Sequence, residues 1–119
     1  MFESVLKEVV EGSTGAMAAL VMDTDGITLA SYTKESSTFD IATVGVELSV
    51  VIKSVVQASE MLEAGQTSEM SIVADDLVTL VRLVNATYFV AMSLQPGGNL
   101  GKARYLLRTK VPELVDELS

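Results

Sequence analysis

The stretch from Thr38 to Gly65, TFDIATVGVELSVVIKSVVQASEMLEAG, limits the possible folds of this chain more than any other segment. Its apolar residues recur at helical spacing over about 25 residues, whereas a strand usually has about 3 to 10. The many valines lower the helix propensity by tenths of a kcal/mol each, and Gly45 lowers it by roughly 1 kcal/mol. Periodicity and length outweigh propensity, so the sequence predicts one long helix.

Both ends of this stretch carry helix signals. Ser36, Ser37 or Thr38 is expected to cap the N-terminus. Asp40 is expected in the first turn, where the helix dipole favours a negative charge. Gly65 is expected to end the helix in a left-handed conformation.

The predicted helix has two unlike faces when residues are placed at roughly 100° intervals. One face is apolar except for Ser59 and is expected to pack on the core: Ile41, Val44, Gly45, Leu48, Val51, Ile52, Val55, Val56, Ala58 and Leu62. The other face is polar with an apolar centre, and it also holds Ala42, Ser49, Glu60 and Met61. A solvated helix would not need Val46 and Val50 there. The interface with a partner or a second copy is therefore predicted at Thr43, Val46, Glu47, Val50, Lys53, Ser54 and Gln57.

Size and composition narrow the class of protein. A chain of 119 residues is expected to form one domain, residues 1–119. Its apolar content of 49% and mean hydropathy of +0.41 are high for a soluble chain and favour an oligomer that covers apolar surface. Eight basic against sixteen acidic residues give a net charge of −8, which opposes binding to nucleic acid.

Targeting signals are not evident in the sequence. No run of about 18 apolar residues is free of charged or strongly polar side chains, so we expect no membrane insertion. The start MFESVLKEVVEG carries Glu3, Glu8 and Glu11 and lacks the basic n-region of a signal peptide, and the chain has no cysteine for disulfides. A cytoplasmic location is therefore expected.

The flanking segments predict the other elements. An amphipathic helix covers Phe2 to Val10 and stops at Gly12, and a final helix covers Leu100 to Leu118, with Pro112 expected to kink or restart it. Five strands are predicted at Ala16–Met22, Ile27–Tyr32, Glu69–Ala74, Leu77–Val84 and Tyr88–Leu94. Asp25-Gly26 predicts a hairpin between the first two strands, and the first strand is apolar enough to be covered on both faces. The sequence thus predicts an α+β fold, a five-stranded antiparallel sheet flanked by helices, in the order α-β-β-α-β-β-β-α.

Catalytic residues are hard to find, because histidine and cysteine, the usual metal ligands and catalytic partners, are both absent. We expect no enzyme, no metal and no cofactor. The acidic residues Asp23, Asp25, Asp75 and Asp76 are interpreted as turn residues. The segment Gly97 to Lys102 is one residue short of a phosphate-binding loop and lacks its Ser/Thr, so helix entry with a close glycine contact explains it better.

The hairpin ALVMDTDGITLASY, the long two-faced helix and the late NLGKARYLL occur in an order that resembles the Roadblock / dynein light-chain family. The resemblance covers about Phe2 to Leu118. It implies a profilin-like sandwich that forms a homodimer, with the sheets joined edge to edge and the long helices side by side. Family members are platforms without enzymatic chemistry of their own. Some are dynein light chains, and bacterial and archaeal relatives act on, or sit beside, small Ras-like GTPases.

On this resemblance, the predicted partners are a second copy and a small Ras-like GTPase, whose regulation could include activation of hydrolysis. The predicted dimer edge is the strand of Glu69, Met70, Ser71, Ile72, Val73 and Ala74. Two alternatives stay open: a dynein-type or other scaffold subunit without effect on hydrolysis, and a small-molecule sensor.

An activating protein often supplies an arginine, and Arg82, Arg104 and Arg108 are the candidates. Arg104 and Arg108 are interpreted as a solvated face that offsets the C-terminal dipole of the last helix. No catalytic arginine is assigned, and positioning of the partner's own residues is the preferred hypothesis.

Overall fold

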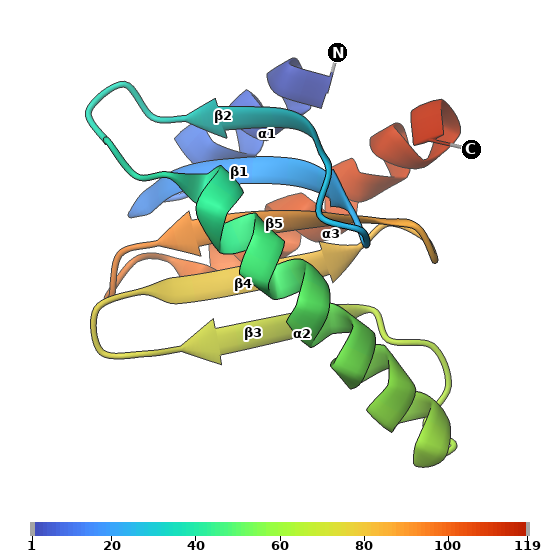
Figure 1. The fold of residues 1–119 in the computed structure, drawn as a ribbon. Coiled ribbons are helices and arrows are strands. Elements are labelled where there is room, and N and C mark those ends of the chain that lie inside the picture. The colour runs from blue at the N-terminus through green and yellow to red at the C-terminus, as the bar shows by residue number, and fades with distance from the viewer. Residues whose placement is uncertain (1, 119) are drawn as a thin grey trace.

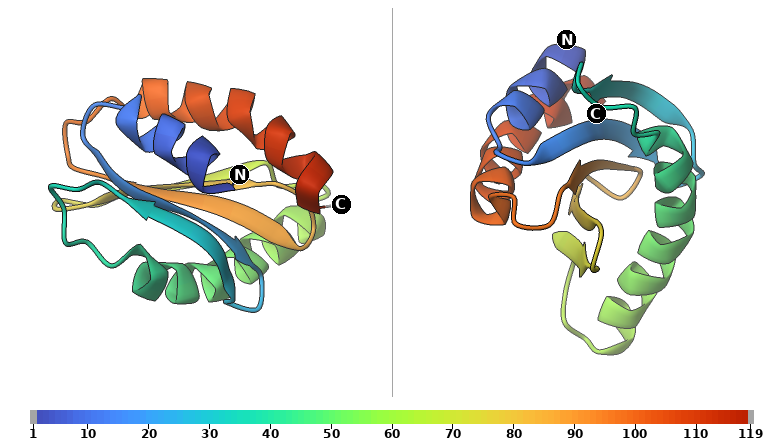
Figure 2. Two further views of the ribbon diagram at one scale, coloured as in Figure 1. Left: turned by 90° about the horizontal axis from the view of Figure 1, so that it is seen from above. Right: turned by 90° about the vertical axis from the view of Figure 1, so that its left-hand side faces the viewer.

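The computed structural model describes residues 2–118, apart from the side chains of residues 115 and 117. A five-stranded sheet in the order β2-β1-β5-β4-β3 lies between α2 on one face and α1 with α3 on the other (Figures 1 and 2). The elements are α1 (Phe2–Glu11), β1 (Ala16–Asp23), β2 (Thr28–Thr33), α2 (Ile41–Met61), β3 (Glu69–Val73), β4 (Val78–Leu83), β5 (Tyr88–Leu94) and α3 (Leu100–Leu118). All strand pairs are antiparallel. The predicted α+β fold and element order are confirmed.

The hairpin between β1 and β2 turns where the sequence predicts it. The Asp23 carboxylate accepts hydrogen bonds from the backbone N–H groups of Asp25 and Ile27, both at 2.9 Å. Gly26 has a φ of 91°, which costs little only for glycine. Asp23 is therefore a turn residue, as expected.

The two faces of the sheet carry separate apolar clusters. Ala19 and Val21 of β1 point toward α1 and α3, while Leu20 and Met22 point toward α2. Because β1 lies inside the sheet and has helices on both sides, it is buried on both faces. This confirms the expected cover of the first strand.

The ends of α2 differ from the prediction. Asp40 is the N-cap itself, since its carboxylate accepts hydrogen bonds from the Thr43 hydroxyl at 2.7 Å and the Thr43 N–H at 3.4 Å. At the other end the helix stops at Met61, and the left-handed turn begins at Glu63, with a φ of 53°. Gly65 is also left-handed but lies beyond the helix end. The predicted cap positions of α2 therefore differ from the observed ones by a few residues.

The core face of α2 is shorter and rotated relative to the prediction. Its buried residues are Ile41, Gly45, Leu48, Ser49 and Ile52. Ser49 was expected on the polar face, but it is buried and donates its hydroxyl to the Val46 carbonyl at 2.6 Å. Val51, Ala58 and Leu62 were expected in the core and are exposed. The C-terminal end of α2, with Leu62, projects past β3, as Figure 1 shows, whereas the exposure of Val51 follows from the rotation of the buried face.

Helix α3 runs through Pro112 as one helix, so the expected restart does not occur. Proline removes the hydrogen bond to the Arg108 carbonyl. Both residues are exposed, so water can replace that bond. The buried face consists of Ala103, Leu107, Val111 and Leu114, and Val115 lies outside the described side chains.

Within residues 2–118, α2 is the one helix that is long and apolar enough to cross a membrane by length and composition. It packs on the sheet through Ile41, Leu48 and Ile52, and it presents Glu47 and Lys53 to solvent. This arrangement is consistent with a soluble protein.

Candidate functional site

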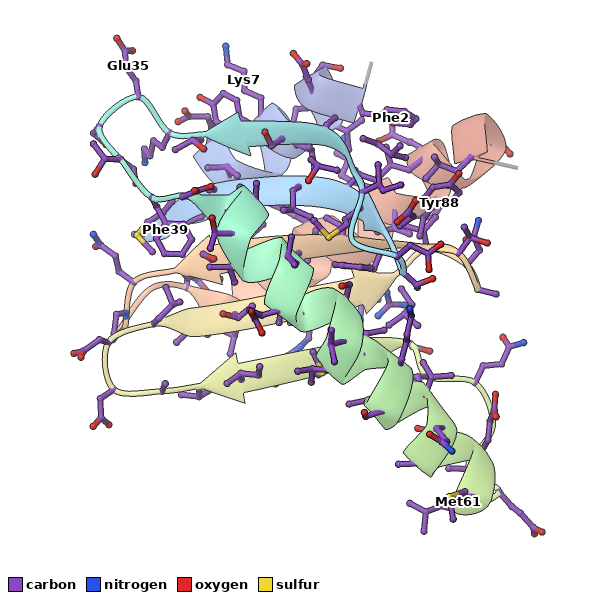
Figure 3. All side chains as sticks on the ribbon, in the orientation of Figure 1. Phe2, Lys7, Glu35, Phe39, Met61 and Tyr88 are labelled. Atoms are coloured by element: carbon purple, nitrogen blue, oxygen red, sulfur yellow. The ribbon has the colours of Figure 1, made fainter. Side chains whose placement is uncertain are left out.

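The outer face of α2 is the first part of the candidate surface. All seven predicted interface residues are exposed: Thr43, Val46, Glu47, Val50, Lys53, Ser54 and Gln57. Val46 is 50% and Val50 65% exposed, and beyond the polar residues Lys53, Ser54 and Gln57 the helix end exposes Met61 and Leu62. Met61 points away from the sheet in Figure 3. The structure thus places the predicted residues in solvent, together with Leu62, which the prediction assigned to the core.

Strand β3 is the second part. It pairs only with β4 and forms an edge of the sheet, so the backbone groups on its outer side have no strand partner within residues 2–118. Ile72 is 41% and Val73 71% exposed. Ala74 lies outside the strand, because its N–H donates to the Leu77 carbonyl in the β3–β4 turn at 3.0 Å. The predicted edge strand is therefore one residue too long, and we call β3 with the seven helix residues the α2–β3 surface.

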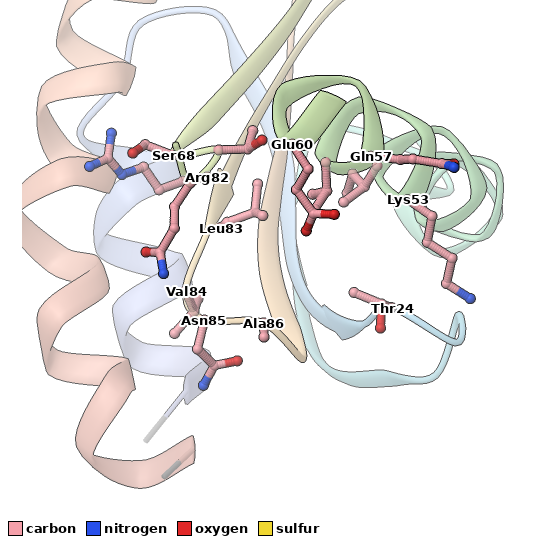
Figure 4. Close-up of a pocket in the computed structure, with 14 residues that line it drawn as sticks. Thr24, Lys53, Gln57, Glu60, Ser68, Arg82, Leu83, Val84, Asn85 and Ala86 are labelled. Atoms are coloured by element: carbon pink, nitrogen blue, oxygen red, sulfur yellow. The ribbon is translucent and has the colours of Figure 1, made fainter. Parts of the chain in front are cut away.

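A cleft of about 680 Å³ opens beside the second half of α2 (Figure 4). Its walls come from α2, the loop 66–68, the end of β4 and the β4–β5 turn. Apolar residues such as Ile52 and Leu83 share it with polar groups from α2, among them Lys53, Gln57 and Glu60. This cleft could not be predicted from the sequence, because its walls are far apart in the chain and come together only in the folded protein.

Two of the three arginines converge on one carboxylate, that of Glu69 at the start of β3. Arg104 donates from Nε to Glu69 Oε2 at 2.8 Å, and Arg82 Nη1 lies 3.9 Å from Glu69 Oε1. Arg108 instead lies over the ring of Tyr105. Because α3 runs to Leu118, Arg104 and Arg108 sit in its first half, so their predicted role at the C-terminal dipole is wrong.

Hydrogen bonds tie the outer elements to one another and shift three pKa values. The Tyr32 hydroxyl donates to Glu11 Oε1 at 2.5 Å, and this bond raises the pKa of Tyr32. Glu8 of α1 holds Lys110 of α3 at 2.7 Å and raises the pKa of that ammonium group. The bonds from Thr43 lower the pKa of Asp40. The first two pairs connect α1 to its neighbours and lie away from the α2–β3 surface.

The segment before α3 uses its glycines for close packing. A Cβ on Gly15 would lie 2.7 Å from the Gly98 Cα, and a Cβ on Gly98 would lie 2.9 Å from the Thr14 carbonyl oxygen. The N–H of Gly98 donates to Gln95 and that of Asn99 to Thr14. These amides are used inside the protein, so the close-contact interpretation of this segment is confirmed.

Metal-binding geometry does not arise in the described part of the chain. Among residues 2–118, no group of three or more His, Cys, Asp or Glu side chains is placed to hold an ion. The described residues thus form an exposed, partly apolar surface on α2 and β3 with a cleft at its side.

The chain is similar to several solved structures. No family model matches the sequence, and no curated protein matches it. Among solved structures, MglC from Myxococcus xanthus is 35% identical, with a TM-score of 0.72 and 98% of each chain covered. A Roadblock/LC7 domain from Streptomyces avermitilis is 11% identical at a TM-score of 0.86, covering 98% of this chain and 96% of the other. An MglB in a tetrameric arrangement is 17% identical at a TM-score of 0.86, covering 95% of this chain and 84% of the other.

The predicted likeness to profilin is also confirmed. Profilin II from Acanthamoeba castellanii aligns over 100% of both chains at 15% identity, with a TM-score of 0.59. At this identity the likeness concerns the fold alone.

Proposed function

The chain belongs to the Roadblock/LC7 domain family, and from that premise we propose that it is a cytoplasmic, non-enzymatic homodimeric platform that binds and regulates a small Ras-like GTPase. The observation that carries the proposal is the exposed apolar stripe of α2 next to an open sheet edge. Val50, at 65% exposure, lies at the centre of that stripe. Large apolar side chains gathered on one face mark an interaction surface rather than a solvated helix.

Self-association uses β3 in this proposal. An unpaired strand edge can add the β3 of a second copy, and a two-fold axis then brings the same residues of both chains together. The family resemblance implies this edge-to-edge sheet, with the two α2 helices side by side. One solved relative in fold, MglB, has a tetrameric arrangement, and its assembly supports the proposal by likeness only.

The GTPase would rest on the part of α2 that the second copy leaves free. The support is the family resemblance, which implies small Ras-like GTPases as partners, and the mixed chemistry of the helix face. Val46 and Val50 offer apolar contact, while Glu47 and Lys53 beside them can pair with charges of a partner.

Regulation would act by positioning groups that the GTPase itself supplies. Arg82 and Arg104 are engaged by Glu69 on the α3 side of the sheet, and Arg108 lies on α3. An arginine that acts in trans must reach the transferred phosphate. Holding the partner's switch segments in a productive position requires no such group from this chain.

The experiment begins with a pull-down from the source organism and continues with single-turnover GTP hydrolysis on any Ras-like protein recovered. Binding that is lost in Val50→Asp and kept in Thr109→Asp, which adds the same charge on α3, supports the proposed surface. A changed hydrolysis rate identifies a regulator, and an unchanged rate identifies the scaffold alternative. No binding of any Ras-like protein would refute the GTPase assignment.

The cleft supports a second candidate, the small-molecule sensor. Its volume of about 680 Å³ falls in the usual range of ligand sites, and Lys53, Gln57 and Glu60 could orient a ligand against Ile52. Native mass spectrometry of the purified protein tests it. A bound small molecule that disappears in Ala86→Trp, which fills the cleft, supports the sensor, and a ligand-free mass counts against it.

A further inference from the structure

The basic residues of this acidic protein are gathered in one part of the sequence. From Leu77 to Pro112 the chain has no acidic residue, although its net charge is −8. The same stretch holds five of the eight basic residues: Arg82, Lys102, Arg104, Arg108 and Lys110. Four of these lie on α3. The helix therefore presents a positive region on a negative protein.

The order of charges along α3 is opposite to the order that stabilises a helix. Lys102 lies in the first turn, which holds no acidic residue, while Glu113 and Asp116 follow toward the C-terminal end. The helix dipole favours negative charge at the N-terminus and positive charge at the C-terminus. Folding stability thus does not explain this distribution, and a departure from such a rule points to a functional use.

Two of the four cations on α3 are neutralised within the protein, and two are not. Arg104 pairs with Glu69, and Lys110 pairs with Glu8. Lys102 and Arg108 make no ion pair with any acidic side chain that the structure describes. Both lie over the ring of Tyr105 instead, with Lys102 Nζ at 5.5 Å and Arg108 Cζ at 5.8 Å from its centre.

The Tyr105 ring holds these two cations in a defined arrangement. Tyr105 is 49% exposed, so part of this residue is available to a partner. Cation–π contacts hold each charge near the ring and leave its N–H donors free. Lys102 and Arg108 are six residues apart, so they lie about 9 Å apart along the helix axis. We call Lys102, Tyr105 and Arg108 the α3 basic face.

We propose that the α3 basic face binds an acidic segment of another protein, through two carboxylates placed on either side of an apolar residue that covers Tyr105. Charge complementarity selects the carboxylates, because each cation lacks an internal acidic partner. The small size of the face selects a short segment. An extended polyanion such as nucleic acid or an anionic membrane would meet the net charge of −8 around it.

This site lies on α3, on the opposite face of the sheet from α2 (Figure 2). Both surfaces can be occupied at once, so a platform could join two different proteins. The inference does not depend on the GTPase assignment. Peptide binding that survives in Val50→Asp would keep it even if the proposed function fails.

The test measures fluorescence anisotropy of a labelled ten-residue peptide of alternating glutamate and leucine, against the same peptide with glutamine. We expect the glutamate peptide to bind at least tenfold more tightly, with an affinity that falls as salt rises. Lys102→Glu/Arg108→Glu should weaken binding at least tenfold. The control Lys7→Glu/Lys34→Glu, with the same change in net charge, should change it less than twofold.

Tyr105→Leu keeps both charges but removes the ring, and it should weaken binding about threefold or more. Circular dichroism checks that each variant is folded. Equal weakening in the two double variants would reduce the effect to net charge and overturn the proposal, as would equal binding of the glutamine peptide.

Other occupants give different results. Vesicles of equal phosphatidylserine and phosphatidylcholine should not sediment the protein, and Lys102→Glu/Arg108→Glu should leave its sedimentation coefficient unchanged. Vesicle binding that this double variant abolishes would assign the face to a membrane. A smaller oligomer in the variant would assign it to a second copy, and either result would overturn the proposal.

Discussion

The two faces of the sheet are covered to different extents, although both have an apolar core. Among the described residues, the cluster under α1 and α3 contains 17 buried apolar residues, while the cluster under α2 contains 9. Two helices close the first face. On the second, the single helix α2 crosses the sheet and its C-terminal end projects past β3, so Met61 and Ile72 remain exposed, as does Val50 on the outer side of the helix. The incompletely covered face is where the protein has apolar surface to share with a partner.

The largest effect on stability is expected when a substitution on the buried side of α2 is compared with one on its exposed side. Leu48→Ala removes a buried side chain next to the sheet and should lower the free energy of unfolding by about 2 to 5 kcal/mol. Val50→Ala, two residues away on the exposed side, should change it by less than about 0.5 kcal/mol in the monomer. Urea unfolding at one protein concentration compares them. Similar losses in both variants would show that α2 is not divided in this way.

The next effect concerns association rather than folding. Val50→Asp places a charge in the centre of the exposed stripe and should raise the dissociation constant of the dimer at least tenfold, about 1.4 kcal/mol. Circular dichroism should show a retained fold, and analytical ultracentrifugation should show a monomer. Thr109→Asp on α3 is the control and should remain dimeric. If Val50→Asp unfolds the protein, Val50 belongs to the core and its assignment to the exposed face of α2 is wrong.

A smaller effect on the dimer is expected at the sheet edge. Val73→Lys puts a long charged side chain on β3, where lysine opposes pairing with another strand. It should weaken the dimer by a smaller factor than Val50→Asp, because the backbone pairing can remain. Thr28→Lys on the other edge strand, β2, provides the comparison. Equal weakening at both edges would contradict the choice of β3, and ultracentrifugation measures it.

The smallest effect tests the cap that fixes the start of α2. The bonds from Thr43 hold the pKa of Asp40 below its ordinary value of 3.8. A lowered pKa means that the charged form stabilises the fold above pH 3.8 and that this contribution is lost as the pH falls through the folded value. Asp40→Asn keeps a cap without the charge.

Wild type should therefore melt at a slightly higher temperature than Asp40→Asn at pH 6, and the difference should shrink as the pH falls below 3.8 and through the folded-state pKa. Thermal unfolding followed by circular dichroism across this range measures it. A difference that stays constant with pH would show that the carboxylate charge is not involved.

The sequence allowed us to predict which residues of the candidate surface face solvent, but not how far that surface extends. Val46 and Val50 stood out because an exposed helix face has no need of two valines. The same periodicity assigned Leu62 to the core, since a pattern of apolar residues does not show where the sheet below a helix ends. The cleft could not be predicted either, because Lys53 and Asn85 meet only through the fold.

Gly45 has one effect that the sequence shows and another that only the structure shows. In the sequence it is a residue that weakens a helix. In the structure it allows α2 to approach β1, because a Cβ there would lie 2.7 Å from the Met22 Cε and 2.8 Å from the Leu20 Cδ2. The cost in helix propensity is thus offset by packing against the sheet.

The sequence alone determined the order of the elements, the hairpin at Asp25-Gly26 and the two-sided character of the long helix, because turn chemistry and periodicity act over a few residues. The tertiary structure decided how far α2 is covered, which strand is left at the edge, and which cations of α3 find a carboxylate. Those properties depend on which distant segments come together, and Glu69 neutralises Arg104 while no described acidic side chain reaches Arg108.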